Sequence, residues 1–133
     1  MHGLRDGPAM KKDEFLARVE KAGAVPSRRE AERRSKAVVS ALAQMLPDSE
    51  SRRHFVSQLP GCLKSHLLAE RPRYLKMTGD AFLQHIGRGL KMHASEAQRT
   101  LRAVYGVLRQ AVPGEVADFE EHIPKHIASL LGR

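Results

Sequence analysis

The chain has 133 residues, of which 41% are hydrophobic and 5% aromatic, and its formal net charge is +8. This length suits one domain or two small, mutually dependent units that share a core. The single cysteine excludes an intramolecular disulfide and most cysteine-based zinc sites, and a lone thiol is typical of a reducing cytoplasm. The longest mostly apolar run, 37–46, is too short to span a bilayer, so we expect a cytoplasmic protein without membrane contact.

The first ten residues show neither hydrophobic periodicity nor the apolar core of a signal peptide. We therefore expect residues 1–10 to be a loose segment. The sequence MKKDEF, from Met10, resembles a natural start, and our hypothesis is that residues 1–9 are an extension before it.

Helical periodicity begins directly after this segment. Apolar residues at i, i+1, i+4 and i+7 predict a first helix over 13–22, and Gly23 lies where its C-cap is expected. Ser27 and Glu30 form a predicted capping box, in which the serine accepts from the N3 amide while the glutamate reaches back. This box should start a long helix over 28–46.

The second half of the chain predicts a similar pair of helices. Thr78 can cap a helix over 79–90, and a long helix follows over 94–112. The position that matches Ser27 is His93, so the capping box is not repeated.

The similarity between the two halves extends to the sequence itself. Three pairs of segments match: DEFLARV with DAFLQHI, EAERRSKAVVSALAQMLP with EAQRTLRAVYGVLRQAVP, and FVSQLPGCL with FEEHIPKHI. The four phenylalanines occupy matching positions in these pairs, and they are Phe15, Phe55, Phe82 and Phe119. The chain is therefore predicted to contain an internal repeat.

Each third segment carries a proline within a helical pattern. The residue before a proline is disfavoured in the α region, whereas proline itself suits the first position of a helix. Leu59 and Ile123 are therefore expected to end one short helix each, and Pro60 and Pro124 to begin the next. A single kinked helix is the alternative.

These elements predict an all-α fold of two tandem helical-bundle repeats, with three to four helices each. We expect the loose segment 1–10, a first repeat over 11–69, a polar linker over 70–77 and a second repeat over 78–133. Each repeat alone would be marginally stable, so the two should share a core around an approximate two-fold axis. The protein is expected to be a monomer or a homodimer.

The order of these elements resembles a bacterial family known as domain of unknown function 2267. The resemblance covers about 12–132 and rests on FLARV and FLQHI, on EAERRSKAVVSAL and EAQRTLRAVYGVL, and on QLPGCL with HIPKHI. Genes of this family often lie near those of stress-response proteins, so the resemblance implies a regulatory or protective association. It implies no activity and no catalytic residues.

A basic outer face is predicted on each of the two long helices. Lysine and arginine there could neutralise phosphates and make binding depend on salt. The candidate anion-binding residues are Arg29, Arg33, Lys36, Arg99, Arg102 and Arg109. The alternative is an ordinary solvated face, since Glu30 and Glu32 stand four residues before Arg34 and Lys36.

The sequence shows no catalytic constellation, no metal site and no cofactor motif. His122 and His126 are four residues apart, but Pro124 interrupts their helix and no further ligands are apparent. Cys62 lies near a helix start, where the dipole could lower its pKa, but the sequence shows no base to activate it. We interpret Cys62 as a small packing residue.

These observations favour a non-enzymatic interaction or regulatory module with a protein partner, in a stress-associated setting. The alternative is a nucleic-acid-associated protein that binds phosphates through its two basic helix faces. Single-strand binding is disfavoured because the four phenylalanines are expected in the core.

Overall fold

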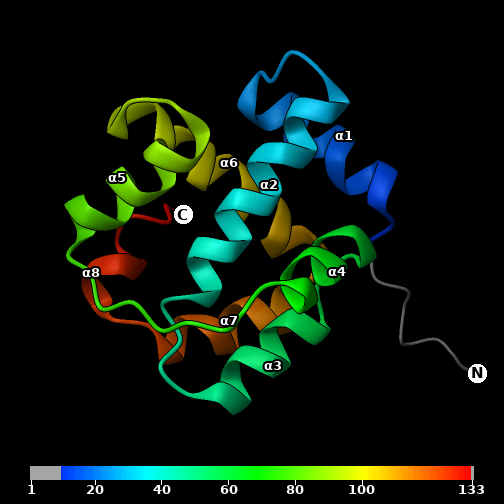
Figure 1. Cartoon of the computed structure of the whole chain (residues 1–133). Helices are drawn as coiled ribbons and strands as arrows, with labels where there is room; N and C mark the ends of the chain where they lie inside the picture. The colour runs from blue at the N-terminus through cyan, green and yellow to red at the C-terminus, as the bar shows by residue number, and fades with distance from the viewer. Residues whose placement is uncertain (1–9, 133) are drawn as a thin grey trace, which may run out of the picture.

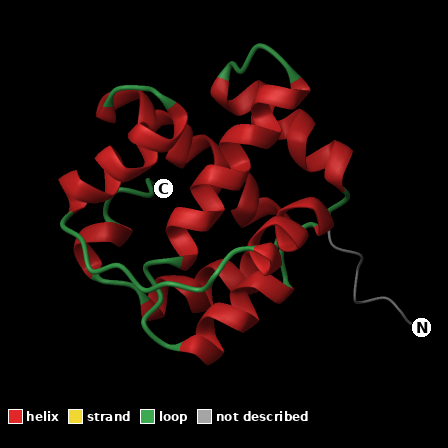
Figure 2. Ribbon diagram, in the orientation of Figure 1, coloured by secondary structure: helices red, strands yellow, loops and turns green. Residues whose placement is uncertain are grey.

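The computed structural model describes residues 10–132, and over these residues the chain folds into eight α-helices and no strands (Figures 1 and 2). The predicted all-α class is therefore confirmed. The helices are α1 (Lys12–Gly23), α2 (Arg28–Ala43), α3 (Ser49–Ser57), α4 (Gly61–Ala69), α5 (Gly79–Leu90), α6 (Ala94–Ala111), α7 (Pro113–His122) and α8 (Lys125–Ala128). The predictions for residues 1–9 fall outside the described part.

Two of the helix starts are fixed by the caps that the sequence predicts. The Ser27 hydroxyl accepts a hydrogen bond of 3.0 Å from the amide of Glu30, and the Thr78 hydroxyl accepts one of 3.1 Å from Ala81. His93 makes no such bond at the start of α6. The Ser27 and Thr78 side chains thus satisfy amides that the first helical turn leaves without a partner.

Other details of the first two helices differ from the prediction. Gly23 is still helical, and the left-handed residue that ends α1 is Ala24, with φ of 50°. The carboxylate of Glu30 accepts hydrogen bonds from Arg33 and Arg34 and does not close the capping box. α2 ends at Ala43, three residues earlier than predicted.

The prolines separate short helices, so the alternative of one kinked helix is wrong. α3 ends before Leu59 and α4 begins after Pro60; α7 ends before Ile123 and α8 begins after Pro124. Both prolines have ψ near 147° and occupy the N-cap of the following helix, whereas the first helical position was predicted. Their extended ψ turns the chain between the two helices.

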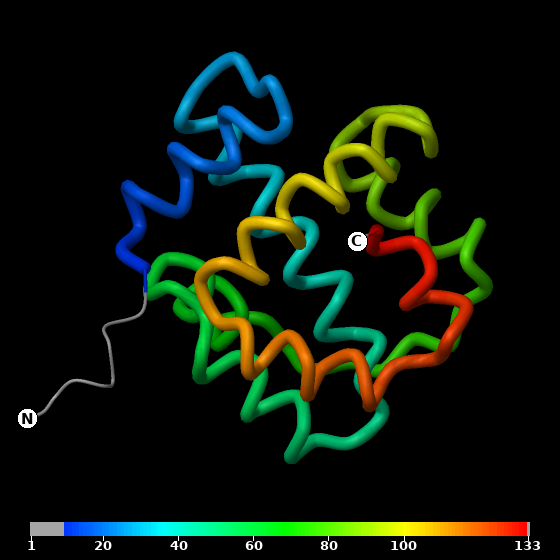
Figure 3. Tube along the Cα trace, turned by 180° about the vertical axis from the view of Figure 1, so that it is seen from behind, coloured from blue at the N-terminus to red at the C-terminus, as the bar shows by residue number. Residues whose placement is uncertain are grey.

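The long helices α2 and α6 lie at the centre of the molecule (Figures 1 and 3). α1 packs on both α2 and α6, and so does α5, while α3 packs against α4 and α7. The rings of Phe55 in α3 and Phe119 in α7 stack with their centroids 4.8 Å apart. All four phenylalanines are buried, as predicted from the sequence, and the buried apolar side chains of residues 10–132 form one core to which both halves contribute.

Two of the connections between the helices have distinctive features. The turn between α5 and α6 requires Gly87, because a Cβ there would lie 2.5 Å from the Met92 carbonyl oxygen. Residues 70–78 form no helix and run from α4 to α5, and the Leu75 amide donates to the Gln44 carbonyl at the end of α2. Within residues 10–132, no helix has the length and apolarity needed to cross a membrane.

Candidate binding site

Four of the six predicted basic residues of α2 and α6 lie in two separate grooves, and Arg109 lines neither of them. Arg33 and Lys36 line a groove between α2 and α5, while Arg99 and Arg102 line another between α6 and α1. Arg29 is exposed and lines neither groove. The six candidate residues therefore do not form one continuous surface.

Most of these basic side chains already have partners within the protein. Arg33 binds both carboxylate oxygens of Glu30, at 2.9 and 2.7 Å, which holds the pKa of Glu30 at about 2. Lys36 pairs with Glu32 at 3.0 Å. Arg102 donates to the Leu130 carbonyl at 3.2 Å and so helps to attach the C-terminal segment to α6. These contacts reduce the charge that the two faces can offer to an external anion.

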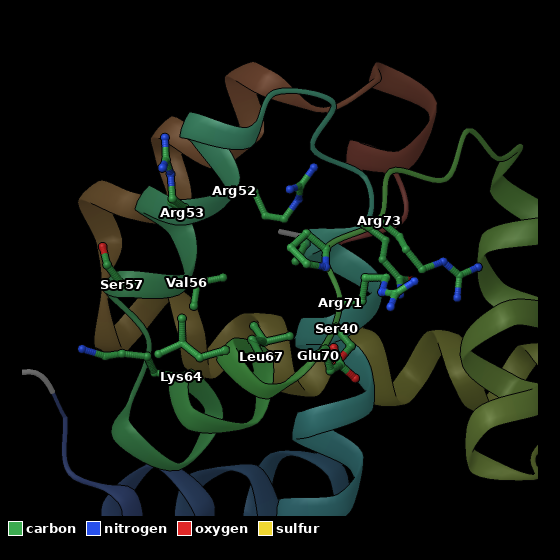
Figure 4. Close-up of a pocket in the computed structure, with 14 residues that line it drawn as sticks. Ser40, Arg52, Arg53, Val56, Ser57, Lys64, Leu67, Glu70, Arg71 and Arg73 are labelled. Carbon is green, nitrogen blue, oxygen red and sulfur yellow. The ribbon is translucent and has the colours of Figure 1, made fainter.

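A different cluster of cations surrounds a hollow that the sequence interpretation missed. The hollow measures about 270 Å³ and lies between the end of α2, α3, α4 and the connection after α4 (Figure 4). The cations in its lining are Arg52, Arg53, Lys64, Arg71 and Arg73. None of these five forms an ion pair with any residue in the described part of the chain. We call this feature the basic hollow.

The basic hollow combines these charges with apolar surface. Ala43, Val56 and Leu67 contribute apolar surface to its walls, and Leu68, also in the lining, is 70% exposed. Figure 4 shows Arg52 and Arg53 on one side of the hollow and Arg71 and Arg73 on the other. An apolar hollow within a ring of cations suits a ligand that is both apolar and negatively charged.

Two polar groups at the basic hollow have distinctive environments. The Nε atom of Arg52 is buried and has no hydrogen-bond partner among the described residues. Glu70, the acidic residue of the lining, accepts a 2.8 Å hydrogen bond from the Ser40 hydroxyl and lies 3.3 Å from His66. The carboxylate of Glu70 is therefore already engaged on the protein.

The sequence signal for the basic hollow was divided between two segments. Arg52 and Arg53 belong to SRRHF in a short helix, whereas Arg71 and Arg73 belong to ERPRYLK in the predicted linker. Their meeting depends on α4, which returns the chain to the end of α2. The density of arginines in both segments was visible, but their proximity in space was not.

A histidine–carboxylate cluster joins α3 to α7. Ligand atoms of His54, Glu115 and Asp118 lie within 4.8 Å of one another, and His54 is 2.7 Å from Glu115. These three residues are the candidates for holding a metal ion, yet the direct contact between His54 and Glu115 already gives two of them a partner. The pair of histidines considered from the sequence is divided, since His122 contacts the Asp118 carbonyl and His126 the Met77 carbonyl.

Cys62 is half-buried near the start of α4. Burial raises the pKa of its thiol, so the suggestion that the helix dipole lowers this pKa is wrong. A thiol with a raised pKa is a weak nucleophile, which agrees with its interpretation as a packing residue.

Comparison with known proteins identifies one family. The model of a family described as "Uncharacterized conserved protein (DUF2267)" matches residues 12–130, so the chain belongs to that family. No curated protein matches the chain.

Proposed function

We propose that this DUF2267 family member is a non-enzymatic helical interaction module that binds an acidic segment of a partner protein at the basic hollow. One observation carries the proposal: five cations surround partly apolar walls, and none forms an ion pair with a described residue. Five cations against the single carboxylate of Glu70 leave an excess of positive charge in the lining, which favours an anionic partner.

The apolar surface supports a protein partner over nucleic acid. Phosphates are polar and gain nothing from Val56, Leu67 or the exposed side chain of Leu68. Protein interfaces, in contrast, combine an apolar centre with arginine anchors and a polar rim. A second copy of the chain is disfavoured as the occupant because its net charge of +8 would repel the basic hollow.

The polar groups of the basic hollow support a non-enzymatic role. Ser40, Glu70 and His66 are neighbours, but Glu70 stands between the serine and the histidine. In a hydrolytic triad the histidine stands between the other two and removes the proton of the serine. Here the Ser40 hydroxyl donates to the Glu70 carboxylate, so no histidine is placed to remove its proton.

We further propose that the scaffold consists of two related units, 11–69 and 78–133, joined by the linker 70–77 around an approximate two-fold axis. Arg18 donates to Gln110 at 2.6 Å, and the residues at matching positions, His85 and Gln44, are 2.8 Å apart. One pair joins α1 to α6, and the other joins α5 to the residue that follows α2. This exchange of equivalent contacts supports the proposed symmetry.

The proposed function is tested by fluorescence anisotropy with a dye-labelled peptide of alternating glutamate and glycine, at about 50 mM salt. Binding should weaken with added salt. In the variant Arg52→Gln/Arg71→Gln it should weaken by about tenfold, the effect of roughly 1.4 kcal/mol from two rim charges.

The matched control is Arg33→Gln/Arg99→Gln, which removes two charges from the grooves on the long helices and should leave peptide binding nearly unchanged. A duplex DNA probe of equal charge is titrated in parallel. Tight DNA binding that this control abolishes, together with absent peptide binding, would replace the proposal with the nucleic-acid alternative.

A further inference from the structure

The basic hollow of the first unit has a filled counterpart in the second. In the aligned segments, Ala43 corresponds to Arg109 and Val39 to Tyr105, while Val56 corresponds to Glu120. Three large or charged side chains of the second unit are thus replaced by small apolar ones in the first. Ala43 and Val56 both line the basic hollow.

The three residues of the second unit form one compact arrangement. The hydroxyl of the buried Tyr105 donates a 2.6 Å hydrogen bond to the carboxylate of Glu120. The guanidinium of Arg109 lies over the Tyr105 ring, 4.7 Å from its centroid, and 3.7 Å from the Glu120 carboxylate. Arg109 also donates to the Gly132 carbonyl. A ring, a carboxylate and a guanidinium therefore satisfy one another at this place.

The first unit retains only one of these three components. Arg52 and Arg71 supply guanidinium groups at the basic hollow, although from other positions in the chain. No aromatic side chain lines the hollow, and its carboxylate, Glu70, is held by Ser40. The missing components are an aromatic ring and a free carboxylate.

We propose that the basic hollow binds an aromatic side chain of the partner protein together with a neighbouring carboxylate. The ring takes the place above Ala43 and Val56, and the carboxylate pairs with Arg52, whose buried Nε has no partner among the described residues. The volume of about 270 Å³ lies just below the roughly 300–1,000 Å³ of pockets for drug-sized ligands, and it suits one or two side chains.

This proposal rests on the proposed function and adds the identity of the recognised side chains. Its test uses two dye-labelled peptides of glutamate and glycine that differ only in one tyrosine next to the central glutamate. The tyrosine peptide should bind at least about tenfold more tightly, because buried aromatic side chains are typical anchors of protein interfaces.

The variant Ala43→Arg/Val56→Glu transfers the ion pair of the second unit into the basic hollow. It leaves the net charge unchanged and should remove the advantage of the tyrosine peptide. The control Ala17→Arg/Ala94→Glu adds one arginine and one glutamate at exposed positions outside the lining, and it should retain the advantage. Circular dichroism verifies that both variants are folded.

A ¹⁵N NMR titration of the unaltered protein provides a test that needs no variant. Addition of the tyrosine peptide should shift the amide signals of Ala43, Val56 and Leu67 most strongly. Shifts confined to other surfaces would overturn the proposal.

The outcomes separate this inference from the proposed function. Equal binding of both peptides, lost in Arg52→Gln/Arg71→Gln, would refute the aromatic anchor and leave the acidic partner in place. Failure of both peptides to bind the unaltered protein would refute the proposed function itself.

Discussion

The stacked rings of Phe55 and Phe119 allow a direct test of whether the two halves of the chain share a core. The side chains are 4% and 2% exposed, and their centroids are 4.8 Å apart. Replacing either by leucine should lower the free energy of unfolding by about 1–2 kcal/mol, since part of the buried volume remains. The two effects should not add, because the stacking contact itself contributes about 0.5–1.5 kcal/mol.

Urea unfolding, followed by circular dichroism at the helix band, measures this coupling in a double-mutant cycle. The control cycle uses Phe55→Leu with Phe82→Leu, since the structure records no ring contact between these residues. Its effects should add within about 0.5 kcal/mol. Additivity in the Phe55/Phe119 cycle, or two separate unfolding transitions, would refute a core shared across α3 and α7.

Two further predictions concern helix starts and acid stability. Thr78→Ala should lower the free energy of unfolding by about 1 kcal/mol because it removes the cap of α5, and His93→Ser should raise this free energy because it adds a cap to α6. Thermal unfolding of each variant measures both effects, and no change in either variant would contradict the capping argument. Arg33 and Arg34 lower the pKa of Glu30 from 4.5 to about 2, so the contribution of Glu30 is complete above about pH 4.5 and is lost as the pH falls towards 2. Urea unfolding across this pH range should show a smaller loss of unfolding free energy in Glu30→Gln than in the unaltered protein, by on the order of 1 kcal/mol or less. An identical loss in the two proteins would contradict this role of Glu30.

The helices were predictable because their signals are local. Thr78 caps α5 as its sequence position indicates, and the bounds of that helix agree with the structure at both ends. The exact end of α2 was not predictable, because Met45 and Leu46 are buried without being helical. Their apolar side chains extended the periodic pattern beyond the point where the helix stops at Ala43.

The candidate site was less predictable because its parts come from separate elements. The spacing of Arg33 and Lys36 along one helix predicted an anion-binding face, yet both residues pair with acidic neighbours. Arg52 and Arg71 have no such periodicity, and only the packing of α4 on α2 brings their segments together. A sequence pattern reports spacing along one element, whereas a pocket depends on how elements pack.

The difference between the two halves is the main argument for the proposed binding of a partner at the basic hollow. Residues that pack across the centre are kept in both halves, as Phe55 and Phe119 illustrate. Residues at the basic hollow are not kept: Ala43 and Val56 line it, whereas the aligned positions in the second half of the sequence are Arg109 and Glu120, which form an ion pair. An excess of like charges in one place destabilises a compact state, whereas the aligned positions of the second half carry the ion pair of Arg109 and Glu120. A hollow lined by cations therefore costs the fold some stability. Such local costs are expected at binding sites and not at a surface with a purely structural role.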